Sequence, residues 1–116
     1  MTKEDTIRTM EMALREALAD YEPTLTLSVR NMFGGAGFYA NGMMFAAWYG
    51  NGLALKLPDD ARAELLRTSG ALAAQSPQYV EVPPAYLEDP SLLRPWAVRS
   101  VDYARRQPPR PRRRRG

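Results

Sequence analysis

The sequence predicts an α+β domain in two layers, with an antiparallel sheet of about five strands and three helices on one face of the sheet. Two patterns carry this prediction. Apolar residues near both ends of the chain recur at three- and four-residue steps, which is typical of amphipathic helices. Between these ends, short apolar segments are separated by glycine-containing turns, which is typical of antiparallel strands. We therefore expect residues 30–56 to form a curled antiparallel ribbon.

The first helix begins at the N-terminus of the chain. Thr2 and Asp5 have the spacing of a capping box, and Glu22-Pro23 is expected to end the helix. One apolar stripe runs along it, made of Ile7, Met10, Leu14, Ala17, Leu18 and Tyr21.

Four strands are expected next, at residues 24–31, 37–40, 43–49 and 53–57. Asn41-Gly42 predicts a type I′ hairpin turn between the second and third, because both positions of that turn need positive φ. Gly50–Gly52 is interpreted as a three-residue loop. A two-residue loop would exchange the two faces of the following strand.

The second half of the chain alternates helix and strand. A helix is predicted over Asp60–Thr68, started by Pro58-Asp59 and ended by Gly70. Residues 71–77 are expected to be a loop, and Tyr79–Val82 a short edge strand.

The last helix is expected to open at Asp89-Pro90, an N-cap followed by proline at the first helical position. Pro95 lies inside the apolar pattern of this helix and should kink it or delay its start. We place the domain at residues 2–103 and expect residues 104–116 to be a disordered Arg/Pro-rich tail.

The tail carries the basic charge of the chain. Residues 105–116 hold seven arginines and no acid. The other 104 residues hold 9 basic and 13 acidic side chains, a net charge of −4, so the body is a poor nucleic-acid surface. The tail either binds nucleic acid without sequence specificity or only improves solubility. Its arginines are Arg105, Arg106, Arg110, Arg112, Arg113, Arg114 and Arg115.

One sheet face is predicted to bind a partner. The Asn41-Gly42 turn, taken with a regular ladder, pairs Phe38 with Phe45, so Phe38, Met43, Phe45, Ala47 and Tyr49 share the face that the helices cover. The other face then exposes Tyr39, Met44, Trp48 and Lys56, beside Ala46. Exposed aromatic patches are typical of partner surfaces, so we expect either a protein partner or a homodimer there. The alternative is that tail or loop segments cover this face.

The chain resembles the TfoX N-terminal domain family, the Sxy-type competence regulators, over about residues 4–104. The match begins with Arg30, Met32-Phe33-Gly34-Gly35, Gly37, Tyr39, Gly42, Met44-Phe45-Ala46 and Leu55-Lys56. It continues with Tyr79, Glu81-Val82-Pro83, Asp89-Pro90, Leu93 and Trp96. The structural motif of the match consists of Met32, Phe33, Gly34, Gly35, Gly37 and Gly42. Ala54 departs from the pattern, because an aromatic residue is common there, and the arginine tail is also unlike the usual end.

The resemblance implies an α+β domain similar to secretion-chaperone-like folds, some of which dimerise. It also implies a non-catalytic bacterial regulator of DNA-uptake competence that acts with the transcription machinery. With no cysteine for disulfides, no typical signal peptide and no apolar run of about 18 residues, we expect a cytoplasmic protein.

We expect no catalytic residue, cofactor or metal. The chain has no His and no Cys, which excludes the common triads and imidazole or thiolate metal sites. Gly35–Ala40 matches a dinucleotide fingerprint, but a hairpin is expected after it where a helix is needed. The pairs Asp59-Asp60 and Glu88-Asp89 stand at helix starts, where acids favour the positive helix end. Lys56 is interpreted as a surface lysine rather than a nucleophile.

Overall fold

The computed structural model describes residues 2–32 and 34–107. Within this part the chain forms three α-helices and one short 3-10 helix, followed here in chain order: α1 (Lys3–Ala17), α2 (Asp59–Leu66), η1 (Pro84–Leu87) and α3 (Pro90–Arg106). Six strands make a single sheet: β1 (Leu27–Met32), β2 (Gly35–Ala40), β3 (Met43–Trp48), β4 (Leu53–Lys56), β5 (Leu72–Ala73) and β6 (Tyr79–Glu81).

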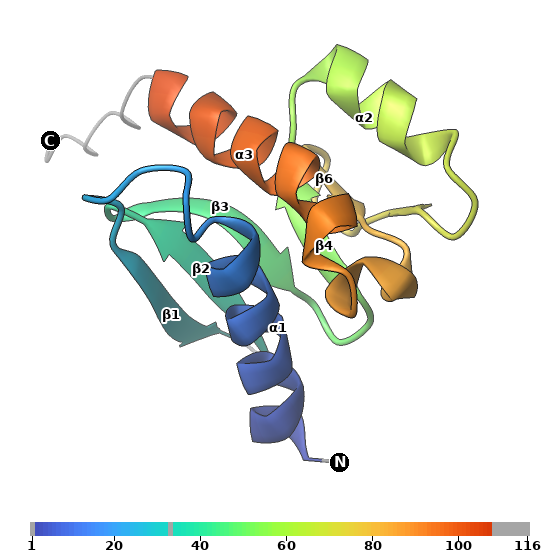
Figure 1. Ribbon diagram of the computed structural model, residues 1–116. Coiled ribbons are helices and arrows are strands. Elements are labelled where there is room, and N and C mark those ends of the chain that lie inside the picture. Colours follow the sequence, from blue (N-terminus) through green and yellow to red (C-terminus); the bar gives the residue numbers. More distant parts are fainter. Residues whose placement is uncertain (1, 33, 108–116) are drawn as a thin grey trace, which may run out of the picture.

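The sheet is antiparallel, with strand order β1-β2-β3-β4-β6-β5, and helices α1 and α3 lie against each other across it (Figure 1). The α+β prediction is confirmed, with one strand more than expected. The prediction of a loop over 71–77 is wrong at Leu72–Ala73, because these residues pair with β6. Strand β6 is therefore an inner strand rather than an edge.

Local sequence chemistry starts α1 and α3 as predicted. The Thr2 side chain accepts a bond from the Asp5 backbone N–H at 3.1 Å, and the Asp5 carboxylate accepts one from the Thr2 N–H at 3.3 Å. Asp89 caps α3 by accepting from the Ser91 N–H at 3.1 Å. Helix α3 then runs through Pro95 without an interruption. The delayed start is therefore wrong, since the helix begins at Pro90.

Helix α3 also continues through Arg106, past the boundary expected at residue 103. Its last turns are attached to the loop after α1. The Tyr21 hydroxyl donates to the Asp102 carboxylate, and the Arg105 guanidinium contacts the Glu22 carboxylate at 2.7 Å. These contacts give residues 104–106 a place in the domain. Residues 108–116 of the expected tail lie outside the described part.

The Asn41-Gly42 turn has the predicted geometry. Asn41 has φ 49° and Gly42 has φ 84°, the two positive values that a type I′ turn requires. The Asn41 side chain also accepts a bond from the Thr26 N–H at 2.8 Å, which joins the turn to the start of β1. Pairing next to the turn is as expected, with Ala40 opposite Met43 and Tyr39 opposite Met44.

A β-bulge then changes the register of β3. The register shifts between Phe38 and Tyr39, so Phe38 lies opposite Ala46 and Phe45 is the extra residue. The predicted Phe38–Phe45 pair is therefore wrong. Beyond the bulge, Ala46 and Trp48 face the helices and Ala47 faces away, the reverse of the predicted assignment.

The connection from β3 to β4 is also longer than predicted. Trp48 pairs with Leu53, which leaves a four-residue loop, Tyr49–Gly52, in place of the three-residue loop. Leu55 consequently lies beside Ala46 on the helix side. The bulge and the longer loop each shift the following side chains by one position, which exchanges the two faces. The two shifts cancel, so Leu53 and Leu55 still enter the core.

The core lies between the sheet and the three helices. All three helices contribute to it, for example through Leu14 of α1, Leu65 of α2 and Leu93 of α3. The largest fully buried side chains are Phe45, Leu14, Leu53, Leu55, Leu57, Leu65, Leu93, Val80, Val101 and Ser100. Ser100 is the polar member of this set, and its hydroxyl donates to the Phe45 carbonyl at 2.6 Å.

Replacing Ser100→Ala is expected to destabilise the domain by about 1–3 kcal/mol, because it removes a buried donor to a buried carbonyl. Urea unfolding followed by circular dichroism measures this free energy. Ser69→Ala at an exposed position is the matched control and should change stability by less than about 0.5 kcal/mol. Equal, small effects of the two substitutions would show that the bond to Phe45 does not stabilise the bulge.

Candidate interaction surface

The sheet face that the helices leave uncovered is called the open face here. The alternation of side chains in each strand, corrected for the bulge, defines its members. They are Ser28, Arg30 and Met32 of β1, Gly35, Gly37 and Tyr39 of β2, Met44 and Ala47 of β3, Tyr49 after it, Ala54 and Lys56 of β4, and Tyr79 and Glu81 of β6.

Three of the four residues predicted for the partner surface lie on the open face. Tyr39, Met44 and Lys56 are there, and each is partly exposed. Trp48 is not: it is 8% exposed, packs in the main core, and its indole N–H donates to the Asn51 carbonyl at 3.0 Å. The bulge at Phe45 is the reason, because it turns Trp48 toward the helices.

Met32, Tyr49 and Tyr79 belong to the open face and were missed by sequence reasoning. Tyr79 forms a small second cluster with Ala47 and Ala54, and Met32, Met44, Tyr49 and Ala74 pack against this cluster. The pairing of β1 with β2 would have placed Met32 on this face, because Met32 lies opposite Gly35 and cross-strand partners share a face. No local pattern indicated the position of Tyr49.

The aromatic residues are held in fixed contacts. The Tyr49 and Tyr79 rings meet edge to face, with centroids 6.1 Å apart. Burial, with smaller effects from Tyr49 and Tyr39, raises the pKa of the Tyr79 hydroxyl above its usual value, so this ring is neutral at pH 7. The Arg30 guanidinium lies over the Tyr39 ring, 5.2 Å from its centroid.

A hollow lies in the open face where its side chains are smallest. It has a volume of about 410 Å³ and is lined by Met32, Gly35, Met44, Trp48, Tyr49 and Gln75. Gly37 lies close to its walls, since a Cβ on Gly37 would be 3.0 Å from the Met44 sulfur and 3.3 Å from the Met32 sulfur. The side of the open face near Tyr79 is partly covered by Ala74, and Tyr79 itself is buried.

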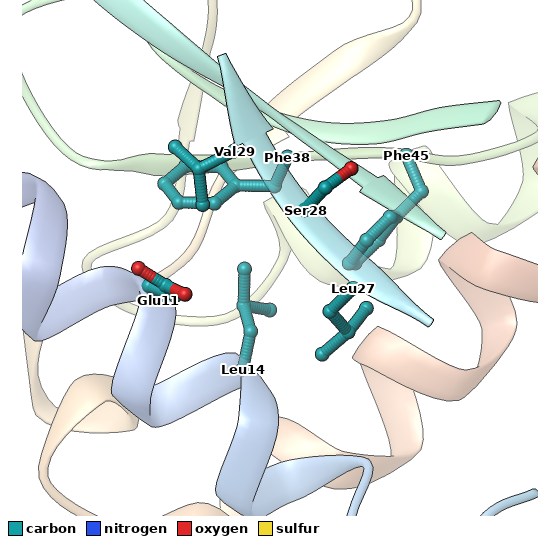
Figure 2. A pocket seen from close by; sticks show the side chains of 7 residues that line it. All are labelled: Glu11, Leu14, Leu27, Ser28, Val29, Phe38 and Phe45. Carbon is teal, nitrogen blue, oxygen red and sulfur yellow. The ribbon is translucent and has the colours of Figure 1, made fainter. Parts of the chain in front are cut away.

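A second space, between α1 and β1, is too small to be a site. Figure 2 shows Leu14 of α1 pointing toward the sheet, with Leu27, Phe38 and Phe45 around its tip. The free volume is about 10 Å³, the size of a single water molecule. This space is a packing gap at the margin of the core.

The acid pairs serve helix starts. Asp59 contacts the Arg62 guanidinium, and Asp60 accepts from the Ala61 N–H at 2.9 Å. Hydrogen bonds from Ser91 lower the pKa of the Asp89 carboxyl. Over the described ranges, no cluster of three or more metal-binding side chains occurs. Gly35–Ala40 is strand β2 followed by a turn, so the helix that a dinucleotide site needs is not there.

The arginines of the expected tail divide into two groups. Arg105 and Arg106 belong to α3, and the bond from Arg105 lowers the pKa of the Glu22 carboxyl. Arg110 and Arg112–Arg115 lie outside the described residues, as does Phe33 of the predicted motif. In the part of the chain that is described, no helix has the length and apolar character to cross a membrane.

These features define a two-layer α+β domain whose sheet has one helix-covered face and one open apolar face. A family model described as the TfoX N-terminal domain matches residues 16–104, and the chain belongs to this family. The resemblance found in the sequence is thereby confirmed. Comparison with curated proteins and with solved structures gave no match.

Substitution by alanine is expected to reduce stability by very different amounts at two glycines of the open face. A Cβ on Gly35 would lie 2.0 Å from the Trp48 carbonyl oxygen, which is backbone, so Gly35→Ala should cost about 3 kcal/mol or more. A Cβ on Gly37 meets the flexible ends of Met32, Tyr39 and Met44, so Gly37→Ala should change stability by less than about 1 kcal/mol.

Urea unfolding of both variants measures the difference. Similar costs for the two substitutions would contradict the close approach of β2 and Trp48 that the structure shows.

Proposed function

We propose that this domain is a non-catalytic regulatory module that binds another protein through the open face of its sheet. The observation that carries the proposal is the apolar hollow between Met32, Met44 and Tyr49, on the face that no described helix covers. Family membership supports a regulatory role, and we include action on transcription or competence in the proposal.

The chemistry of the open face suits a protein partner. Methionine side chains are flexible and polarisable, so Met32 and Met44 adapt to apolar side chains of different shape. Tyrosine adds a large, stiff contact area with a polar end, which is why it is enriched at interfaces.

The same evidence favours binding over catalysis. The chain has neither His nor Cys, and Asp59, Asp60 and Asp89 of its adjacent acid pairs are engaged at helix starts. Lys56, the candidate nucleophile, is partly exposed on the margin of the open face. A partly exposed lysine without an acid or base beside it is better suited to contact a partner than to attack a substrate.

Replacing Met44→Glu is expected to weaken partner binding at least about tenfold, because it places a carboxylate in the wall of an apolar hollow. The partner is first captured from the native host with the full chain and identified by mass spectrometry. Its affinity for purified variants is then measured by titration calorimetry. Sedimentation velocity on the same variants tests whether the partner is a second copy of the chain.

The matched control is Met12→Glu. Met12 is 62% exposed on α1, in the helical layer, so the same change there should leave the affinity unaltered. Thermal unfolding of both variants confirms that each is folded. If Met44→Glu and wild type bind the captured partner equally, the open face is not its binding site.

A further inference from the structure

The acidic side chains of the domain are concentrated outside the sheet, whereas basic side chains occur in both layers. The chain has 13 acidic residues, and Glu81 is the one that lies on a strand; the others are in helices, helix caps and connecting loops. No acid occurs between Glu22 and Asp59, a stretch that contains strands β1 to β4. Glu81 itself is 8% exposed and lies against Gly52.

The cations of the open face are Arg30 and Lys56. Neither forms an ion pair with any described residue, whereas Arg15, Arg62, Arg99 and Arg105 all do. Arg30 is on β1 and Lys56 on β4, and between them lie strands β2 and β3, which carry Gly35 and Met44 of the hollow. Three strand spacings of about 4.8 Å separate these strands by about 14 Å.

From this arrangement, and resting on the proposed function, we infer that the open face recognises an acidic segment with an apolar anchor. In such a segment an aromatic or branched apolar side chain is flanked by carboxylates. The apolar side chain enters the hollow between Met32, Met44 and Tyr49. The flanking carboxylates lie over Arg30 and Lys56, which are free of ion pairs among the described residues.

Charge complementarity favours a negatively charged segment over a positively charged one. A segment with basic flanks would meet two cations and no exposed acid on this face, which disfavours it. A segment with acidic flanks gains two exposed ion pairs. Each pair contributes little by itself, but a segment with basic flanks lacks both of them and is repelled by the two cations.

A protein segment suits the face better than a nucleic acid does. Single-stranded nucleic acids bind along a continuous basic groove with exposed stacking rings. Here the strands between the two cations carry Gly37, Ala47 and Met44, none of which has a charge or a stacking ring. Of the tyrosines, Tyr79 is buried and Tyr39 is already stacked under Arg30. The open face is therefore better suited to hold an apolar side chain of a protein segment in its hollow than to stack nucleic-acid bases.

Four fluorescein-labelled probes test the inference with the full chain, by fluorescence anisotropy at low salt. The first is a peptide with Phe-Leu-Phe between Asp-Glu flanks. The second keeps the apolar centre and has Lys-Lys flanks, and the third keeps the acidic flanks around Gly-Ser-Gly. The fourth is oligo(dT). We expect the first peptide to bind at least about tenfold more tightly than the second or third.

A charge-reversed chain gives the sharper measurement. The double variant Arg30→Glu/Lys56→Glu is expected to lose about tenfold in affinity for the acidic peptide and to prefer the Lys-flanked peptide instead. Arg8→Glu, at an exposed position of α1, is the matched control and should keep the wild-type order of affinities. Circular dichroism shows that the variants remain folded.

Three outcomes would overturn the inference: no peptide binding, an unchanged preference in the double variant, or oligo(dT) binding that Met44→Glu and Lys56→Glu abolish. None of them is the same as failure of the proposed function. If Met44→Glu releases the native partner while charge reversal does not, the open face binds a partner of different chemistry. If neither change releases it, the open face is not the binding site.

Discussion

The β-bulge at Phe45, closed by the hydrogen bond from Ser100, decides which residues of the sheet are inside and which are outside. The extra residue lets Phe45 and Ala46 both enter the core, where a regular strand would turn one of them outward. From that point the alternation is inverted, so Trp48 is buried and Ala47 is on the open face. Helix α3 supplies the Ser100 hydroxyl, so the sheet register depends on how the last helix docks.

The hollow of the open face is a direct consequence of this register. Because Trp48 is directed to the helices, the position above β3 is occupied by Ala47, and its cross-strand neighbour is Gly37. Gly35 and the longer side chains of Met32, Met44 and Tyr49 line the hollow, in place of a flat aromatic patch. Because of the bulge, Trp48 is buried, and the open face has a hollow lined by methionine and tyrosine side chains instead of an exposed tryptophan.

The sequence predicts those features that local chemistry determines. The capping box at Thr2, the Asn41-Gly42 turn and the Asp89 cap each depend on a few adjacent residues, and all three are confirmed. The bulge was not predictable in this way, because its stabilising donor, Ser100, lies far along the chain from Phe45. Strand β5 was missed because two exposed residues carry no alternation, and its formation depends on the neighbouring β6. Trp48 was therefore assigned to the wrong face, while Tyr39, Met44 and Lys56 were assigned correctly.

Stability and recognition are divided between the two layers, but they share one strand. On β3, Met44 forms a wall of the hollow, and Phe45, the next residue, is fully buried in the core. A slip by one position would place Met44 inward and Phe45 outward, and would remove core and hollow together. The acids in the helical layer and the cations on the open face would keep their separation even then, because helices and strands carry them independently. Charge asymmetry can therefore orient an approaching partner, whereas the shape that holds its side chain depends on the register that Ser100 stabilises.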